Sequence, residues 1–233
     1  MIPKGVPSVP PFTIKRKAGN PMSTPKQQYY ENLADSLIDK FNLRGIEGYY
    51  CETKEEALLT AKRFLTPGCS VSWGGSQTLE EIGLIADLKN SDYTVYDRAT
   101  AVTQEEKDAL YAEVSHCDYY FMSSNAITLD GQLVNVDGLG NRVASLIHGP
   151  KNVVIVAGMN KVAPSLDAAM ERVRNIAAPP NCIRLGLNTP CAKFGRCVDC
   201  LDDSCICCET VITRKSRIAG RIKVILVGET LGY

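Results

Sequence analysis

Short apolar runs alternate with longer amphipathic stretches along most of the chain. Runs of this kind, rich in Val, Ile and Tyr, are typical of buried strands. Strands that alternate with helices need crossover connections. The pattern therefore predicts an α/β fold in three layers, with a mostly parallel sheet covered by helices. The strands are expected at residues 48–51, 69–73, 93–96, 118–122 and 152–157, with a last one within 221–233.

Helix starts are marked by capping boxes between these runs. The pattern T-x-x-E begins at Thr53, Thr78 and Thr103. Such a box offers side-chain partners to the unpaired amides of a first helical turn, so each threonine predicts a helix N-terminus. A longer amphipathic helix is expected over 23–41. The residues expected on its buried face are Tyr30, Leu33, Leu37 and Phe41.

The second half of the chain departs from the alternating pattern. Asp130-Gly131 separates two β-like runs within 127–136, which predicts an inserted antiparallel β-hairpin. Residues 165–177 predict a further helix, which Pro179-Pro180 should stop. Because an apolar strand returns within 221–233, the Cys-rich segment 182–208 is expected to be an excursion from the main fold.

Composition favours one domain over two. With 233 residues, of which 45% are hydrophobic, the chain can bury a full core. We expect a single α/β domain over 23–233. Residues 1–22 hold five prolines and a basic KRK triplet, so we expect a disordered leader there, and whether residues 1–21 are native stays open. No run resembles a secretory signal or a membrane span, which predicts a cytoplasmic protein.

Charge does not point to a polyanionic partner. Lys plus Arg and Asp plus Glu both number 26, so the net charge is zero. No global field attracts nucleic acid or an acidic membrane, and we expect neither as a partner. The oligomeric state stays open.

Two polar segments are candidate binding sites for a small anionic metabolite. The first is Gly74-Gly75-Ser76, where glycines let a ligand approach the backbone before a helix. The alternative is a tight strand-to-helix turn without a ligand. The second segment, 123–150, combines amide donors, carboxylates and one arginine, although turns explain part of it. Its candidate residues are Asn125, Asp137, Gly138, Asn141 and Arg142.

Six of the ten cysteines lie between Cys191 and Cys208. Four thiolates complete a tetrahedral site for zinc or anchor an iron-sulfur cluster, and the spacing does not choose between these cofactors. A disulfide knot would need an oxidising compartment. Cys205 and Cys208 could replace the last ligand. The expected metal ligands are Cys191, Cys197, Cys200 and Cys207.

Three stretches resemble the LUD-domain family of lactate-utilisation proteins. They are GGSQTLEEIGL, SSNAITLDGQLVNVDGLGNRVASLIHGPKNVVIVAGMNK and NTPCAKFGRCVDC, in this order, and the resemblance covers about residues 24 to 228. It implies a fold similar to ribose-5-phosphate isomerase, glucosamine-6-phosphate deaminase and CoA transferases. It also implies a place in the oxidation of L-lactate to pyruvate, beside iron-sulfur redox partner proteins.

Carried over by motif, Gly74 to Ser76 would form one wall of the pocket, and the five candidates of segment 123–150 would lie opposite. The long lactate-utilisation proteins also carry a ferredoxin-like domain with repeated C-x2-C-x2-C-x3-C-P runs, whereas this chain has one Cys-rich excursion. An electron-transfer chain within the protein is therefore not expected, while one cluster stays open.

Three functions compete at this point. The first is a lactate-utilisation protein that binds a small anionic metabolite, as one component of an oxidoreductase. The second is an isomerase or CoA-transferase-like enzyme in which Asp137 or Asp130 removes a proton and Arg142 holds the anion. The third is a non-enzymatic binding or assembly module that a metal stabilises. Whether the protein is an enzyme stays open.

Overall fold

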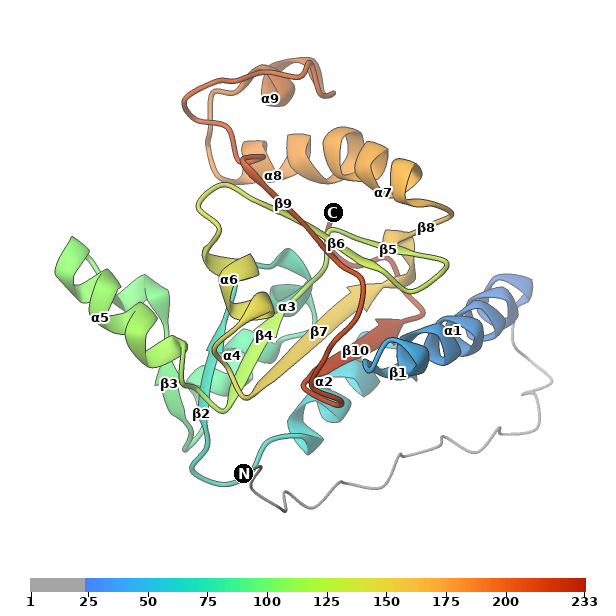
Figure 1. Cartoon of the computed structure of the whole chain (residues 1–233), viewed down its shortest axis with the longest axis horizontal. Coiled ribbons are helices and arrows are strands. Elements are labelled where there is room, and N and C mark those ends of the chain that lie inside the picture. The colour runs from blue at the N-terminus through green and yellow to red at the C-terminus, as the bar shows by residue number, and fades with distance from the viewer. Residues whose placement is uncertain (1–23) are drawn as a thin grey trace.

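A six-stranded parallel sheet forms the centre of the protein, which a computed structural model describes for residues 24–233 (Figure 1). The predicted leader, residues 1–22, lies outside the described residues. The strand order is β1-β10-β7-β4-β2-β3, and every neighbouring pair is parallel. The α/β prediction with a mostly parallel sheet is therefore confirmed. The strands are β1 (Glu47–Cys51), β2 (Ser70–Trp73), β3 (Thr94–Tyr96), β4 (Tyr119–Met122), β7 (Asn152–Gly158) and β10 (Ile222–Val227).

A second, four-stranded sheet was not predicted. The predicted hairpin is present as β5 (Ala126–Thr128) and β6 (Leu133–Asp137), which are antiparallel. It does not enter the large sheet. It pairs instead with β8 (Val162–Ala163) and β9 (Glu209–Thr213), in the order β8-β5-β6-β9. β9 follows the Cys-rich segment and β10 returns to the large sheet, so this segment is an excursion, as predicted.

Most helix starts follow the capping signals, with one exception. Thr53 and Thr103 cap their helices through the amides of Glu56 and Glu106. The expectation for Thr78 is wrong, because Ser76 caps that helix and Thr78 lies buried within it. The helices up to the hairpin are α1 (Pro25–Leu43), α2 (Lys54–Arg63), α3 (Gln77–Glu81), α4 (Leu84–Lys89), the short η1 (Arg98–Thr100) and α5 (Gln104–Val114).

Prolines do not stop the helix after residue 165, contrary to prediction. A π-helical turn, η3 (Val173–Ala177), joins α7 (Leu166–Arg172) directly to α8 (Ala178–Arg184). Pro179 and Pro180 lie in the first turn of α8, directly after the π-helical turn, so their missing amide protons fall where the α-helical hydrogen-bond pattern is already interrupted. The other helices of the second half are α6 (Asn141–Ile147), the short η2 (Met159–Lys161) and α9 (Pro190–Phe194).

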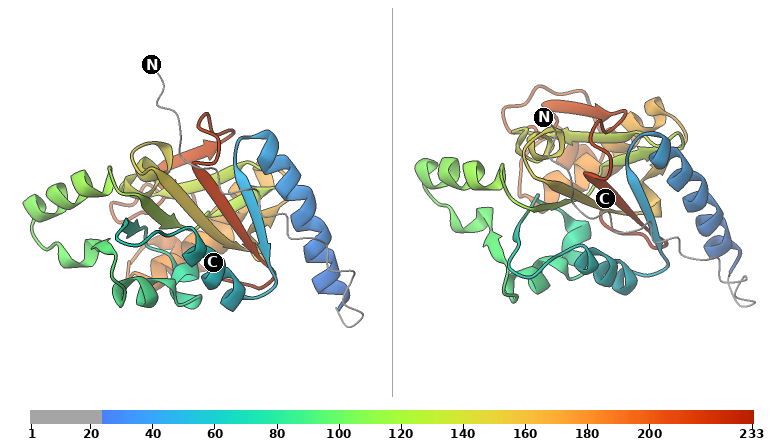
Figure 2. Two further views of the ribbon diagram at one scale, coloured as in Figure 1. Left: turned by 90° about the horizontal axis from the view of Figure 1, so that it is seen from below. Right: turned by 60° about the horizontal axis from the view of Figure 1, so that its bottom comes forward.

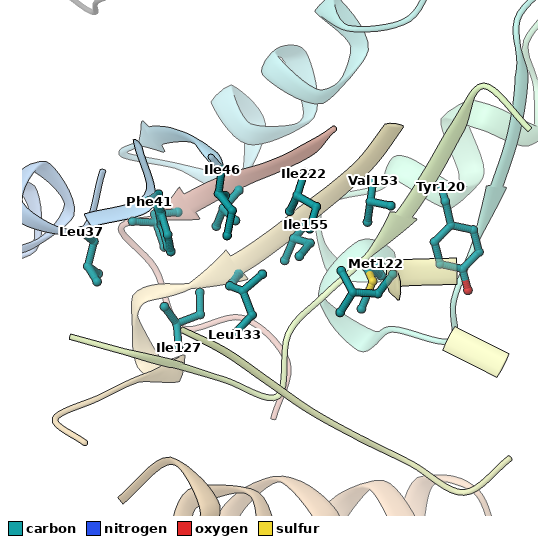
Figure 3. Close-up of a cluster of buried hydrophobic side chains, with 14 of the residues drawn as sticks. Leu37, Phe41, Ile46, Tyr120, Met122, Ile127, Leu133, Val153, Ile155 and Ile222 are labelled. Carbon is teal, nitrogen blue, oxygen red and sulfur yellow. The ribbon is translucent and has the colours of Figure 1, made fainter. Parts of the chain in front are cut away.

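Both faces of the large sheet are covered. On one face, α2, α3 and α4 enclose a core that includes Leu79, Leu88 and Phe121. On the other face, the buried side of α1 and the hairpin pack against the strands (Figure 2). Figure 3 shows this second core, in which Phe41, Ile127 and Ile155 come from three different elements. Among residues 24–233, no helix is both long and apolar enough to cross a membrane.

Candidate functional site

A cavity of about 320 Å³ lies where the strands of the large sheet end. Ser76 follows β2, Ser123 follows β4 and Lys161 follows β7, and all three line the cavity. Parallel strands bring the segments after their carboxyl ends to one edge, which is the usual place for ligands in open α/β sheets. The volume suits a small molecule.

The two segments predicted from sequence meet at this cavity. Of the predicted residues, only Gly74 is not part of the wall. A Cβ atom on Gly74 would lie 2.9 Å from Cγ of Arg142, so the lack of a side chain at Gly74 leaves room for the arginine. The predicted residues that line the cavity are Gly75, Ser76, Asn125, Asp137, Gly138, Asn141 and Arg142.

Arg142 is surrounded by acceptors from the hairpin and from the end of β4. Its Nε donates to Oδ1 of Asp137 at 2.9 Å, and Nη2 lies 2.6 Å from the same oxygen. The two Nη atoms also donate to the side chains of Asn135 and Asn125 and to the carbonyls of Ser123 and Val136. All of the guanidinium nitrogens are thus engaged within the protein.

Asp137 is held as firmly as its partner. It lies buried at the end of β6, and its second oxygen accepts the amide of Val143 at 2.9 Å. Both carboxylate oxygens therefore have partners. The predicted catalytic roles of Asp137 and Arg142 stay predictions, and the contacts favour a supporting role, in which the pair fixes the shape of the wall.

Lys161, which the sequence analysis missed, is the most unusual group at the cavity. Its side chain is almost fully buried, and Nζ donates to Oγ1 of Thr78 at 2.8 Å and to Oγ of Ser123 at 2.9 Å. Within residues 24–233 it makes no ion pair with a carboxylate. Burial, reinforced by Arg172 and Arg142, lowers the pKa of Lys161 to about 7.

Positive charge dominates the cavity wall. Three arginines line it against one acidic side chain, that of Asp137, and Lys161 adds a fourth basic group. Arg98 lies beside the backbone of Gly75, where a Cβ atom would collide with its guanidinium. In the described part of the chain, no side chain or carbonyl accepts a hydrogen bond from Arg98. The three arginines are Arg98, Arg142 and Arg184.

The cysteine segment borders the same cavity. Cys207 and Ile206 are part of the wall, and a Cβ atom on Gly138 would touch Cα of Ile206 at 3.3 Å. The amide of Cys208 donates to the carbonyl of Asp137 at 2.9 Å. The predicted thiolate site and the predicted ligand site are therefore neighbours.

The thiols lie in pairs. Sγ of Cys182 is 3.6 Å from Sγ of Cys191, and Cys205 and Cys208 are also 3.6 Å apart. Two thiolates on one tetrahedral zinc ion would be about 3.8 Å apart, given Zn–S bonds of about 2.3 Å. Both pairs therefore fit two ligands of one ion. Over residues 24–233, however, no group of three or more potential ligands is arranged around a common point.

The predicted ligand set stays a prediction, and Cys182 joins the candidates. It was missed because it lies in α8, nine residues before Cys191, outside the dense cysteine run. Although the Cys207 residue is exposed, burial of its thiol and the nearby Cys182, Cys191 and Cys197 raise its pKa to about 12. At least four thiols thus lie near one another.

Comparison with known structures supports the fold. A DUF162 family protein from Deinococcus radiodurans aligns with a TM-score of 0.51 at 12% identity, covering 85% of this chain and 98% of that one. Eukaryotic eIF2B beta from Chaetomium thermophilum gives a TM-score of 0.36 at 14% identity, over 56% and 46%. Ribose 5-phosphate isomerase from Plasmodium falciparum gives 0.30 at 17% identity, over 48% and 52%. At these identities, the first match shows the fold alone.

The comparison with curated proteins finds no match. The model of the LUD domain matches residues 34–227, which include both sheets, the cysteine segment and every residue of the cavity wall except Tyr233. Such a match supports a function related to lactate utilisation in general terms. This protein belongs to the LUD domain family.

Proposed function

We propose that this LUD domain protein binds a small anionic metabolite in the cavity and contributes to the oxidation of L-lactate to pyruvate. The observation that carries the proposal is the charge of the wall, where three arginines face one acidic side chain, that of Asp137, which is already paired with Arg142. Arg98 and Arg184 are exposed at the cavity and pair with no carboxylate among residues 24–233, so a bound anion would offset their charge. Family membership supports lactate and pyruvate as the first anions to test.

Arg98 is the cation best suited to hold the carboxylate of the metabolite. Its guanidinium has no acceptor within the described residues, unlike that of Arg142, and its planar fork matches a carboxylate. Arg184 keeps Nη1 free, because only Nε and Nη2 donate to Asn181. Asp137 and Arg142 keep the opposite wall in place.

Isothermal titration of L-lactate, pyruvate and acetate into the protein tests the proposal. Arg98→Met should weaken lactate or pyruvate binding at least tenfold, since it removes a charged hydrogen-bond donor. Arg174→Met is the matched control, because Arg174 is exposed and does not line the cavity. Absence of binding at millimolar anion, or equal loss in both variants, would contradict the proposal.

An isomerase or CoA-transferase-like activity is the alternative function, and the same titration experiment tests it. It requires a free carboxylate base, and both oxygens of Asp137 already accept hydrogen bonds. Titrations with ribose 5-phosphate and acetyl-CoA test this reading directly. Tight binding of either, with weak binding of lactate and pyruvate, would favour it.

We also propose a thiolate metal site beside the cavity, centred on Cys182 and Cys191. The 3.6 Å contact between their sulfurs supports it, and the predicted ligands Cys197, Cys200 and Cys207 are the candidates to complete the set of four. Zinc would supply folding stability, whereas an iron-sulfur cluster would accept an electron from a reaction or from a redox partner protein.

Metal analysis of protein purified without oxygen tests the thiolate site. The expected result is one equivalent of zinc, or iron with sulfide and a visible spectrum that dithionite bleaches. Cys191→Ser should abolish the bound metal, while Cys69→Ser serves as a control, because Cys69 lies buried at the start of β2, far along the chain from this segment. Protein without metal in either form would contradict this proposal and leave anion binding untouched.

A further inference from the structure

Lys161 is buried and donates to two neutral hydroxyl groups, without an ion pair to a carboxylate among residues 24–233. It is the last residue of η2, the short helix that directly follows β7. Its side chain is almost fully buried and lines the cavity. Its two acceptors are hydroxyl groups, which offer no negative charge. The position is fixed at the carboxyl edge of the sheet.

Both hydroxyl groups send their own protons elsewhere. Oγ1 of Thr78 donates to the carbonyl of Leu231 at 3.4 Å, and Oγ of Ser123 donates to the carbonyl of Ser124 at 3.5 Å. Each oxygen therefore receives a proton from Nζ. A neutral amine has two protons and one lone pair, so two donated hydrogen bonds match the neutral form, whose lone pair would have no donor partner among residues 24–233.

The charges around Lys161 favour the neutral amine. Arg172 from α7 and Arg142 from α6 repel a proton on Nζ, and Glu81 from α3 is the carboxylate that attracts one. Arg172 is itself buried and donates to the carbonyls of Asn160 and Asn125. The burial of Lys161 adds to the repulsion, so that a large fraction of the amine is unprotonated near neutral pH.

We propose that Lys161 is a nucleophile that forms an imine with the carbonyl carbon of a small 2-oxo acid bound in the cavity. The inference rests on the proposed function, because the anion site brings the carbonyl to the amine. Desolvated lysines are known to act in this way on carbonyl substrates.

The step balances without a redox reagent. The lone pair of Nζ attacks the carbonyl carbon, a C–N bond forms, and the carbonyl electron pair moves to oxygen, which takes a proton. The nitrogen then loses a proton and the hydroxyl group leaves as water, which gives the imine. Amine and 2-oxo acid are thus converted to imine and water.

Reductive trapping tests the inference. The protein is incubated with pyruvate and sodium cyanoborohydride, and peptide mapping by mass spectrometry locates the adduct. We expect one reduced adduct per chain, at Lys161, and at least tenfold more of it at pH 8 than at pH 5. L-Lactate, which lacks a carbonyl, should give none.

Lys161→Met separates this inference from the proposed function. Methionine is uncharged, like the unprotonated amine, but forms no imine, so pyruvate should still bind by titration through Arg98 while the adduct disappears. Pyruvate that binds the native protein without an adduct at Lys161, or adducts spread over exposed lysines such as Lys193, would overturn the inference alone. Propanal provides an uncharged probe: if pyruvate does not bind but propanal marks Lys161, the nucleophile stands and the anion site fails.

Discussion

The wall built on Asp137 and Arg142 and the cysteine segment lie side by side, yet their stability has different origins. In the wall, each buried polar group is matched by a partner from another strand or loop, apart from Nδ2 of Asn135, which has none in the described chain. In the cysteine segment, Leu201 is 98% exposed and the thiols meet only in pairs. The first region is organised by contacts within the protein, whereas the proposed thiolate metal would add order to the second.

Of the substitutions that test this comparison, Arg142→Met should cause the largest loss of stability. It leaves the buried carboxylate of Asp137 without its cation and the side-chain oxygen of Asn135 without its donor, while Asp137 and Asn125 each keep one backbone amide. Breaking one half of a buried ion pair costs about 3–5 kcal/mol in the free energy of unfolding. Urea denaturation at pH 7 measures this loss.

The double variant Asp137→Asn/Arg142→Met is the control, because it removes both charges. It should recover part of the loss. If the single variant costs less than about 1 kcal/mol, the wall is not held by this pair, and Arg142 becomes available for an anion, as the sequence analysis expected.

Lys161→Met should produce an intermediate effect that depends on pH. The unfolded chain binds a proton on this lysine up to its ordinary pKa of 10.5, whereas the folded protein releases it near pH 7. The stability of the native protein therefore rises as pH increases from about 7 to 10 and is lowest below this range. The methionine variant lacks this dependence.

We expect Lys161→Met to exceed the native protein in stability at pH 6, on the order of a few kcal/mol, and to lose that advantage towards pH 10. Urea midpoints at pH 6, 7.5 and 9 provide the measurement. A constant difference across these values would show that the amine stays charged, which would also remove the basis for imine formation at neutral pH.

Leu201→Ser should have the smallest effect, because its side chain is almost wholly in solvent. A surface substitution of this kind changes stability by less than about 0.5 kcal/mol. The same urea experiment applies. A larger loss would mean that the segment is covered in solution, and sedimentation would then show whether a second copy of the chain covers it.

The large sheet could be predicted from sequence because its strands are buried on both faces. Runs such as 153–157 are apolar throughout, and burial of that extent leaves a clear pattern. The second sheet could not be predicted in the same way. β9 has exposed or half-buried residues along its length, and β8 has two residues, so neither gives a periodic signal.

The candidate site shows the same contrast. Its glycine, asparagine and aspartate residues could be predicted, because segment 123–150 holds more polar residues than its turns require. Lys161 was not, since a lysine after a strand resembles an ordinary solvated residue. Only the fold brings it close to Arg142 and Arg172. Pro179-Pro180 misled the prediction for a related reason: prolines end a helix from within but are tolerated in the first turn of the next one.

The central position of β10 also constrains how the protein can be assembled during synthesis. In the described part of the chain, β10 is the only strand that pairs with β1, although Glu47 and Lys223 are far apart in sequence. Until residues 222–227 leave the ribosome, β1 and α1 have no sheet to join, and β7 has an open edge. A segment that is made long before β10 is therefore among the last to join the sheet, which makes this edge the place where a chaperone or a mispaired strand would act.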